Sequence, residues 1–254
     1  MPTYERCVMS NEPGLEGIVI NSAGCKLLGV LYQAAGEGLH PTALVLHGVP
    51  GMEKNTDIAY ALRDAGWNAL IFHYRGCWGS EGDYTLPGIP DDVRAAMDAL
   101  LSGRFRVDAS RIAAIGHGLG GWAAIVAASR DVRIRAVATL GGIVNLRTMS
   151  LRDQDAANYA LFLHNVTGKG IQSHWRALGW TYNPVDVVDL LHSCPLLIVH
   201  GTADMVAPLS QATELKSRAG DAADLVLIEG ADHIFSRHRR QLVDTVVEWL
   251  QKKL

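Results

Sequence analysis

The stretch Gly-His-Gly-Leu-Gly at residues 116–120 constrains the fold of this chain more than any other feature. The apolar run at residues 112–115 predicts a short buried strand before it, and the small residues at 122–128 predict a helix that packs closely on a sheet. A strand, a tight Gly-x-Ser-x-Gly turn and a helix form the elbow that raises a nucleophilic serine above a sheet. Position 118 is glycine, so the sequence predicts the elbow without its attacking side chain. Glycine adopts the strained backbone of such a turn at no steric cost, so we expect the fold to survive.

Strand-like runs alternate with helix-like segments along the rest of the chain. We expect strands at residues 16–20, 26–32, 42–46, 69–74, 135–140, 196–199 and 225–228. We expect helices at residues 55–65 and 91–101. A final helix is expected to carry one apolar face formed by Leu242, Val243, Val246, Val247 and Leu250. This alternation predicts an α/β protein with a mostly parallel, doubly wound sheet.

Length, charge and cysteine usage favour a cytoplasmic globular enzyme. A chain of 254 residues suits one large α/β domain. Lys and Arg number 23 against 26 Asp and Glu, which gives no electrostatic support for a nucleic-acid or membrane partner. Residues 1–6 begin no apolar signal segment, and no apolar run approaches the ~20 residues of a membrane span. The spacing of the four cysteines predicts reduced thiols; they are Cys7, Cys25, Cys77 and Cys194.

A long segment between the strands at 135–140 and 196–199 interrupts the alternation. It is too long for a simple crossover, and it contains helix-like patches and several aromatic residues. We interpret residues 143–182 as a helical cap, inserted into a core formed by residues 1–142 and 183–254. The alternative is an ordinary crossover helix followed by a disordered loop, although the aromatic content argues against disorder.

Two loops late in the chain supply candidates for a catalytic acid and base. Asp204 follows one predicted strand, and His233 follows the last strand and precedes the final helix. The order of elbow, Asp204 and His233 matches the Ser…Asp…His order of one group of hydrolases, so we predict that Asp204 orients His233 as general base. Asp204 could instead cap the following helix, and His233 could be a surface histidine. Asp232 and Glu229 are weaker rival acids.

A glycine-rich turn after the strand at 42–46 supplies a candidate oxyanion site. The backbone N–H of Val49 in this turn and that of Leu119, just after the elbow centre, could together stabilise an oxyanion. Ser80 and Cys77 are the nearby alternative nucleophiles. Ser80 lies in a turn where serine typically bonds the backbone, so we do not favour it.

Three histidines end strands at one edge of the predicted sheet and raise the question of a metal site. They are His47, His117 and His200. No carboxylate is spaced beside them as a ligand set, so we expect neither a metal nor another cofactor.

Together these motifs resemble the α/β-hydrolase superfamily, and the resemblance covers nearly the whole chain. Residues 46–55, Leu-His-Gly-Val-Pro-Gly-Met-Glu-Lys-Asn, and 72–82, Phe-His-Tyr-Arg-Gly-Cys-Trp-Gly-Ser-Glu-Gly, are similar to capped esterases and acyl-peptidase-like hydrolases. Cinnamoyl- and feruloyl-type esterases share this layout and carry a cap in the same place. The resemblance implies a serine hydrolase. The elbow of these relatives reads Gly-His-Ser-x-Gly-Gly, so this chain departs from it only at Gly118.

The sequence therefore predicts a carboxylic-ester hydrolase of the Ser-His-Asp type that lacks its nucleophile but binds a small-molecule ester or lactone. Either a working hydrolase was altered at position 118, or a natural relative binds ligand, or acts through water, without a covalent step. An amidase or peptidase of the same fold is the other enzymatic alternative. The expected pocket is apolar or aromatic. Its candidate lining residues are Met52, Trp78, Trp175, Trp180 and Met205.

Overall fold

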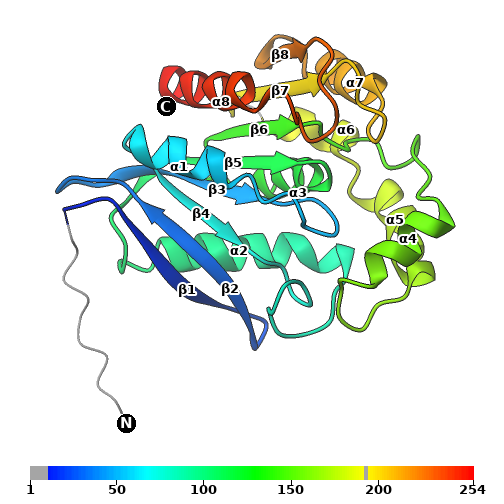
Figure 1. The fold of residues 1–254 in the computed structure, drawn as a ribbon, viewed down its shortest axis with the longest axis horizontal. Coiled ribbons are helices and arrows are strands. Elements are labelled where there is room, and N and C mark those ends of the chain that lie inside the picture. The colour runs from blue at the N-terminus through cyan, green and yellow to red at the C-terminus, as the bar shows by residue number, and fades with distance from the viewer. Residues whose placement is uncertain (1–10, 192–193) are drawn as a thin grey trace.

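One eight-stranded sheet forms the centre of the computed structural model, which describes residues 11–191 and 194–254 (Figure 1). The strand order is β1-β2-β4-β3-β5-β6-β7-β8, and β2 runs in the direction opposite to the other seven strands. The strands are β1 (Gly14–Ser22), β2 (Cys25–Gln33), β3 (His40–Leu46), β4 (Asn68–Phe72), β5 (Val107–His117), β6 (Ala136–Leu140), β7 (Leu196–Gly201) and β8 (Ala223–Ile228). The predicted mostly parallel sheet is therefore confirmed.

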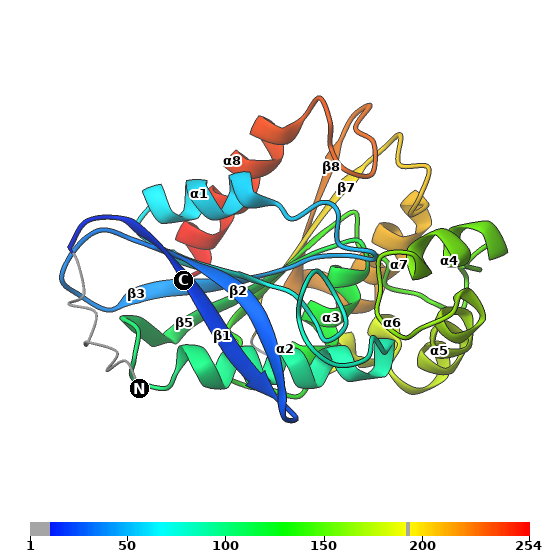
Figure 2. The ribbon, with the colours of Figure 1, turned by 60° about the horizontal axis from the view of Figure 1, so that its bottom comes forward.

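Helices cover both faces of the sheet, which makes the fold doubly wound (Figure 2). One face is covered by α1 (Thr56–Asp64) and α8 (Arg239–Lys253). The other face is covered by α2 (Ile89–Leu100), α3 (Leu119–Ala128), α6 (Pro184–Val187) and α7 (Leu209–Ala219). The remaining helices are α4 (Asp153–Ala160), α5 (Gly168–Thr181) and the short 3-10 turns η1 (Leu86–Gly88), η2 (Val188–Leu191) and η3 (Gly220–Ala222).

The central strand β5 is buried on both faces over its second half. Ile112 and Ala114 face the core under α2 and α3, whereas Ala113 and Ile115 face the core under α1 and α8. A strand enclosed in this way has the continuous apolar run seen in the sequence. It begins earlier than residues 112–115 predict, because its backbone pairs with β3 as far back as Val107. The pattern of apolar side chains in the sequence does not show where the backbone pairing of a strand begins.

Glycines let three chain segments cross at the elbow without side chains between them. A Cβ on Gly116 would lie 2.0 Å from the carbonyl oxygen of Gly120. A Cβ on Gly120 would lie 2.1 Å from the carbonyl oxygen of Leu46, at the end of β3. Both distances are far below van der Waals contact, so β5, α3 and β3 approach as backbone against backbone. This crossing fixes where position 118 lies relative to the sheet.

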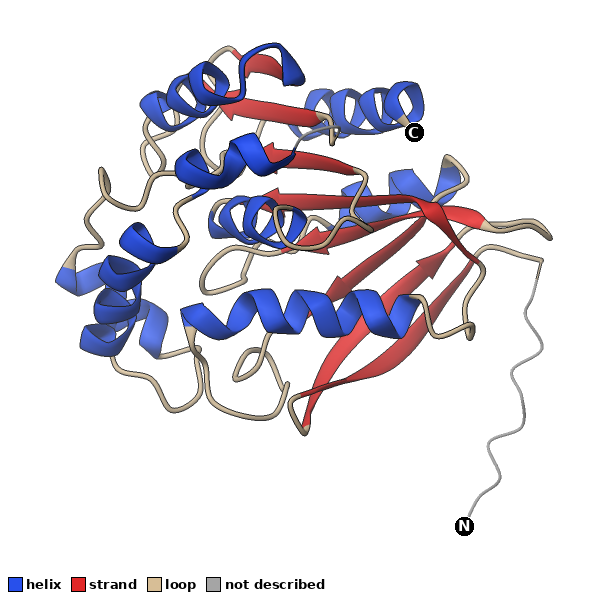
Figure 3. Cartoon of the chain, turned by 180° about the vertical axis from the view of Figure 1, so that it is seen from behind, coloured by secondary structure: helices blue, strands red, loops and turns tan. Residues whose placement is uncertain are grey.

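The segment that the sequence analysis interprets as a cap contains α4 and α5. Both helices lie beyond the carboxyl ends of the parallel strands (Figures 1 and 3). The chain leaves and re-enters the core at one place, because the Asn183 side chain accepts a hydrogen bond from the Leu146 N–H (2.9 Å) and donates one to Asn145 Oδ1 (3.0 Å). A backbone bridge between Cys77 and Leu163 adds a second attachment.

Residues 1–6 and Cys7, which the sequence analysis discusses, lie outside the described residues. Cys25, Cys77 and Cys194 carry free thiols. Within the described part of the chain, no helix is both long and apolar enough to cross a membrane.

We expect the Gly120→Ala substitution to destabilise the protein by roughly 3 kcal/mol or more, because the new methyl group would meet the Leu46 carbonyl in a backbone contact that has no room to relax. Gly17→Ala is the matched control, since a Cβ there has nothing within 4 Å. The control should change the free energy of unfolding by less than about 0.5 kcal/mol. Urea unfolding of both variants measures the difference. Equal, small effects would show that the elbow crossing is looser than described.

Candidate active site

The loops after β7 and β8 bring Asp204 and His233 together. His233 Nδ1 lies 2.8 Å from Asp204 Oδ2. The other carboxylate oxygen of Asp204 accepts hydrogen bonds from the N–H groups of Val206 and Ala207, each at 2.8 Å. Asp204 therefore orders its own loop and also contacts the imidazole. It does not cap the following helix, because the N-cap of α7 is Pro208 and no side chain bonds that end of the helix.

The charge state of Asp204 follows from these contacts. Burial alone would raise the pKa of its carboxyl group, but the hydrogen bond and charge of His233 and the two backbone N–H groups outweigh burial and lower it.

The two rival acids, Asp232 and Glu229, do not lie in the position of Asp204. Asp232 is exposed and accepts hydrogen bonds from the backbone and hydroxyl of Ser236 (2.8 and 2.7 Å), and Glu229 is exposed.

Position 118 lies directly in front of the free nitrogen of His233. A Cβ built on Gly118 would be 3.1 Å from His233 Nε2 and 3.5 Å from Cε1. The backbone of Gly118 has φ 55° and ψ −119°, a conformation that residues with a Cβ adopt only under strain. The imidazole thus faces the space that a serine side chain would fill, and it would have to retreat by a few tenths of an ångström to admit one.

The predicted oxyanion turn packs against the elbow. A Cβ on Gly48 would lie 3.0 Å from the His117 carbonyl oxygen and 3.5 Å from the Leu119 nitrogen, so the two turns are in contact. Two side chains hold the outer part of the turn. Tyr74 Oη donates to the His47 carbonyl (3.1 Å), and Trp78 Nε1 donates to the Pro50 carbonyl (2.7 Å).

A cavity of about 540 Å³ opens at position 118, and we call it the elbow cavity. Its floor includes Val49, Gly118, Leu119 and His233, and residues 149–152 of the segment before α4 form much of its wall. The volume falls within the ~300–1,000 Å³ typical of small-molecule sites. Three of the four groups predicted besides the nucleophile, Val49, Leu119 and His233, therefore line one cavity, and the fourth, Asp204, contacts His233 from outside it.

The structure brings three of the five expected substrate-contacting residues to the elbow cavity, namely Met52, Trp175 and Met205. Trp78 does not border it, because its indole packs on Phe162 with ring centroids 6.1 Å apart. Trp180 does not border it either, and 79% of its surface is exposed. Sequence reasoning missed four apolar or aromatic wall residues, which no local signal separates from other apolar positions: Ile143, Met149, Leu151 and Tyr159.

The three strand-end histidines bond backbone carbonyls. His117 Nε2 lies 2.9 Å from the His233 carbonyl oxygen, and His200 Nε2 lies 2.9 Å from that of Ala207. His47 Nδ1 lies 2.7 Å from the Gly48 carbonyl oxygen. In each neutral ring the nitrogen that faces the carbonyl carries the proton and donates it to that carbonyl. No group of His, Cys, Asp and Glu able to hold a metal occurs within residues 11–191 and 194–254.

Two of these histidines, His117 and His200, hold the loops that carry His233 and Asp204, a role that the sequence did not reveal. Burial lowers the pKa of His117 to about 4 and that of His47 to about 3, and it also lowers the pKa of His200. All three are therefore neutral near pH 7. His117 thus holds the main chain of His233, and His200 holds the loop that follows Asp204.

The two substitute nucleophiles are engaged elsewhere. Ser80 Oγ donates to the His73 carbonyl (2.8 Å) and accepts from the Leu28 N–H (3.0 Å). Burial raises the pKa of the Cys77 thiol to about 12, so the thiolate is not populated near neutral pH. Neither residue borders the elbow cavity.

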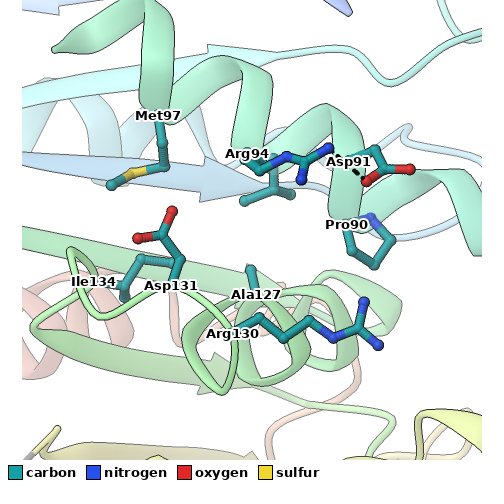
Figure 4. A pocket seen from close by; sticks show the side chains of 9 residues that line it. Pro90, Asp91, Arg94, Met97, Ala127, Arg130, Asp131 and Ile134 are labelled. Atoms are coloured by element: carbon teal, nitrogen blue, oxygen red, sulfur yellow. Dashed lines mark hydrogen bonds and ion pairs between the residues drawn. The ribbon is translucent and has the colours of Figure 1, made fainter. Parts of the chain in front are cut away.

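A separate cavity of about 120 Å³ lies between α2 and the far end of α3 (Figure 4). It is remote from the elbow, because Ala127 lies about 12 Å along α3 from Leu119. Three of its four charged residues are paired: Arg94 with Asp91, as Figure 4 shows, and Asp131 with Arg133. We regard it as a packing gap between two helices.

Comparison with known proteins agrees with this geometry. Residues 57–254 match the prolyl oligopeptidase family, and the chain belongs to this family. An uncharacterized protein of Mycobacterium tuberculosis is 28% identical over 221 residues, which cover 87% of this chain and 72% of that protein. The uncharacterized protein YfhR of Escherichia coli is 29% identical over 218 residues, covering 82% and 71%. The structure of ferulic acid bound to Est1E from Butyrivibrio proteoclasticus superimposes with a TM-score of 0.77 at 22% identity, covering 93% of this chain and 98% of that one. The α/β-hydrolase fold is thereby established.

Buried neutral His117 predicts a pH dependence of stability. The unfolded chain binds a proton on this residue near its usual pKa of 6.5, whereas the folded chain does so only near 4. Stability therefore falls as the pH drops through this window, by up to about 1.4 kcal/mol per pH unit for this residue. His117→Gln removes the titration, so its unfolding free energy should fall less steeply. Urea unfolding at several pH values compares the slopes, and identical slopes would contradict the assignment.

Proposed function

We propose that this chain is a carboxylic-ester hydrolase scaffold that binds an ester or lactone but cannot form an acyl-enzyme. The observation that carries the proposal is the position of His233 Nε2, 3.1 Å from where the Cβ of residue 118 would be. Membership of a hydrolase family supports it. The solved structure of Est1E with ferulic acid makes esters of aromatic acids our leading substrate class.

The proposed chemistry is that of the form with serine at position 118. His233 Nε2, oriented by Asp204, takes the hydroxyl proton while the serine oxygen attacks the ester carbonyl. The N–H groups of Val49 and Leu119 stabilise the tetrahedral oxyanion. His233 then gives the proton to the departing alkoxide, which leaves an acyl-enzyme. A water molecule, deprotonated by His233, attacks the acyl carbonyl and releases the carboxylic acid and the serine.

With glycine at position 118 the first step has no attacking oxygen. Loss of the nucleophile from such a triad costs about a million-fold in turnover, and binding together with the oxyanion donors retains only about a thousand-fold over water. The cavity, its wall and both backbone donors remain, so we expect an intact ester to bind and persist.

A second proposed function follows from the same space. A water molecule at the vacant side-chain position would lie within hydrogen-bond distance of His233 Nε2, which could take its proton during direct attack on the ester. This route predicts slow hydrolysis by the unmodified chain that disappears in His233→Ala. The family name also leaves hydrolysis of an amide or peptide as an alternative activity. Each ester is therefore tested beside the amide of the same acid.

Restoring the nucleophile is the direct test. Gly118→Ser should gain at least about a thousand-fold in ester hydrolysis, blocked by one covalently bound fluorophosphonate per chain. It should also lower the melting temperature by a few degrees, because φ 55° is strained for serine. His233→Ala in the serine background is the control and should abolish both activity and labelling. A folded Gly118→Ser protein with neither turnover nor label would overturn the proposal.

The tryptophans of α5 test where the ester binds. Trp175 borders the elbow cavity and donates to the carbonyls of Leu146 (3.2 Å) and Met149 (2.9 Å). Trp175→Phe removes both bonds beneath the cavity wall, so we expect ester affinity to fall by about tenfold. Trp180→Ala is the control and should leave ester affinity unchanged. Calorimetric titration with a slowly hydrolysed ester measures both. Lower melting temperature without lower affinity in Trp175→Phe would assign this residue a packing role only.

A further inference from the structure

A second cavity, of about 380 Å³, adjoins the elbow cavity, and we call it the cap cavity. Met149, Ser150 and Leu151 border both cavities and form the wall between them. Trp175 also borders both. The volume is again that of a small-molecule site. Nothing in the proposed ester chemistry uses this space.

The cap cavity carries an unbalanced positive charge. Arg147 and Arg176 both border it, and no acidic residue does so within the described chain. Arg147 is neutralised by two bonds to Asp186 (2.6 and 2.7 Å). Arg176 lies exposed on α5 and has no hydrogen bond or ion pair within residues 11–191 and 194–254. Its guanidinium group is therefore available to a ligand.

An aromatic surface lies beside this charge. Trp180 is 79% exposed, and Arg147 lies over its ring at 5.5 Å from the centroid. Neither the Trp180 Nε1–H nor the Ser150 hydroxyl has a partner in the described residues. A ligand ring that packs on this indole would remove a large apolar area from water, which is favourable.

We propose that the cap cavity binds an aromatic carboxylate. The fork of Arg176 matches the two oxygens of a carboxylate, which is the geometry in which Arg binds most strongly. The indole of Trp180 offers a face for the ligand ring, and the Ser150 hydroxyl can donate to a carboxylate oxygen. A neutral aromatic ligand would leave the guanidinium group unmatched, and an aliphatic acid would leave the indole uncovered.

The shared wall couples the two cavities. A ligand that fixes Met149 and Trp175 from the cap side alters the wall of the elbow cavity, and binding at either site then changes affinity at the other by the same factor. The acid released from an aromatic ester has the chemistry that the cap cavity fits. That link to a released acid rests on the proposed function, whereas binding at the cap cavity does not.

The test titrates 1-naphthoate into the unmodified chain and follows the tryptophan indole N–H resonances by NMR. The Trp180 resonance, assigned from Trp180→Phe, should shift in a saturable way. Arg176→Gln should weaken binding by at least about tenfold, and 1-naphthamide, which lacks the charge, should bind at least about tenfold more weakly than the acid. Arg240→Gln is the matched control, since this arginine is 95% exposed on α8, and it should leave affinity unchanged.

Each contrary result overturns the proposal. An unmoved Trp180 resonance, equal affinity in Arg176→Gln, or equal affinity for the amide would each do so. Weaker binding in Met205→Ala, with no effect of Arg176→Gln, would place the acid in the elbow cavity instead. A failure of Gly118→Ser to hydrolyse esters would contradict the proposed function but would leave the naphthoate result intact, so the two failures are distinguishable.

Discussion

The close crossing of main chains at the elbow is the constraint on which the site depends. Gly116 and Gly120 let β5 and α3 turn sharply against the end of β3, at distances that no side chain tolerates. This crossing presents the Leu119 N–H beside the turn that carries Val49. Gly118 contributes backbone bonds alone: its N–H donates to the Leu140 carbonyl, and its carbonyl accepts from the Gly121 and Ile143 N–H groups, each at 3.0 Å. Its side chain can therefore be absent while the surrounding backbone keeps its arrangement.

The loops of the candidate acid and base, Asp204 and His233, are held by a second set of contacts, made to backbone carbonyls. His117 bonds the carbonyl of His233, and His200 bonds that of Ala207 in the Asp204 loop. Both histidines are buried, and burial lowers the pKa of each, so both are neutral donors near pH 7. Fixing the main chain of a catalytic loop limits the movement of its side chain. The contact between His233 and Asp204 therefore does not depend on a side chain at position 118.

Much of the fold could be predicted from the sequence, because strand and helix periodicities alternate clearly and parallel strands place their following loops at one edge. That rule brought Asp204 and His233 to the elbow. The bond from His117 to the His233 carbonyl could not be predicted, since it joins residues 116 positions apart. Helix geometry could have separated Trp175 from Trp180, because five residues rotate a helical side chain by about 140°. The two rings therefore face different surroundings.

The most direct test of the central claim is a crystal structure of the unmodified chain soaked with 1-naphthyl acetate. The account predicts an intact ester in the elbow cavity, with its carbonyl oxygen within hydrogen-bond distance of the N–H groups of Val49 and Leu119 and its carbonyl carbon facing the empty position at Gly118. An ester bound elsewhere, or one whose carbonyl oxygen contacts neither N–H, would contradict the assignment of this site. Cleavage of the ester in the crystal would contradict the claim that Gly118 closes the reaction.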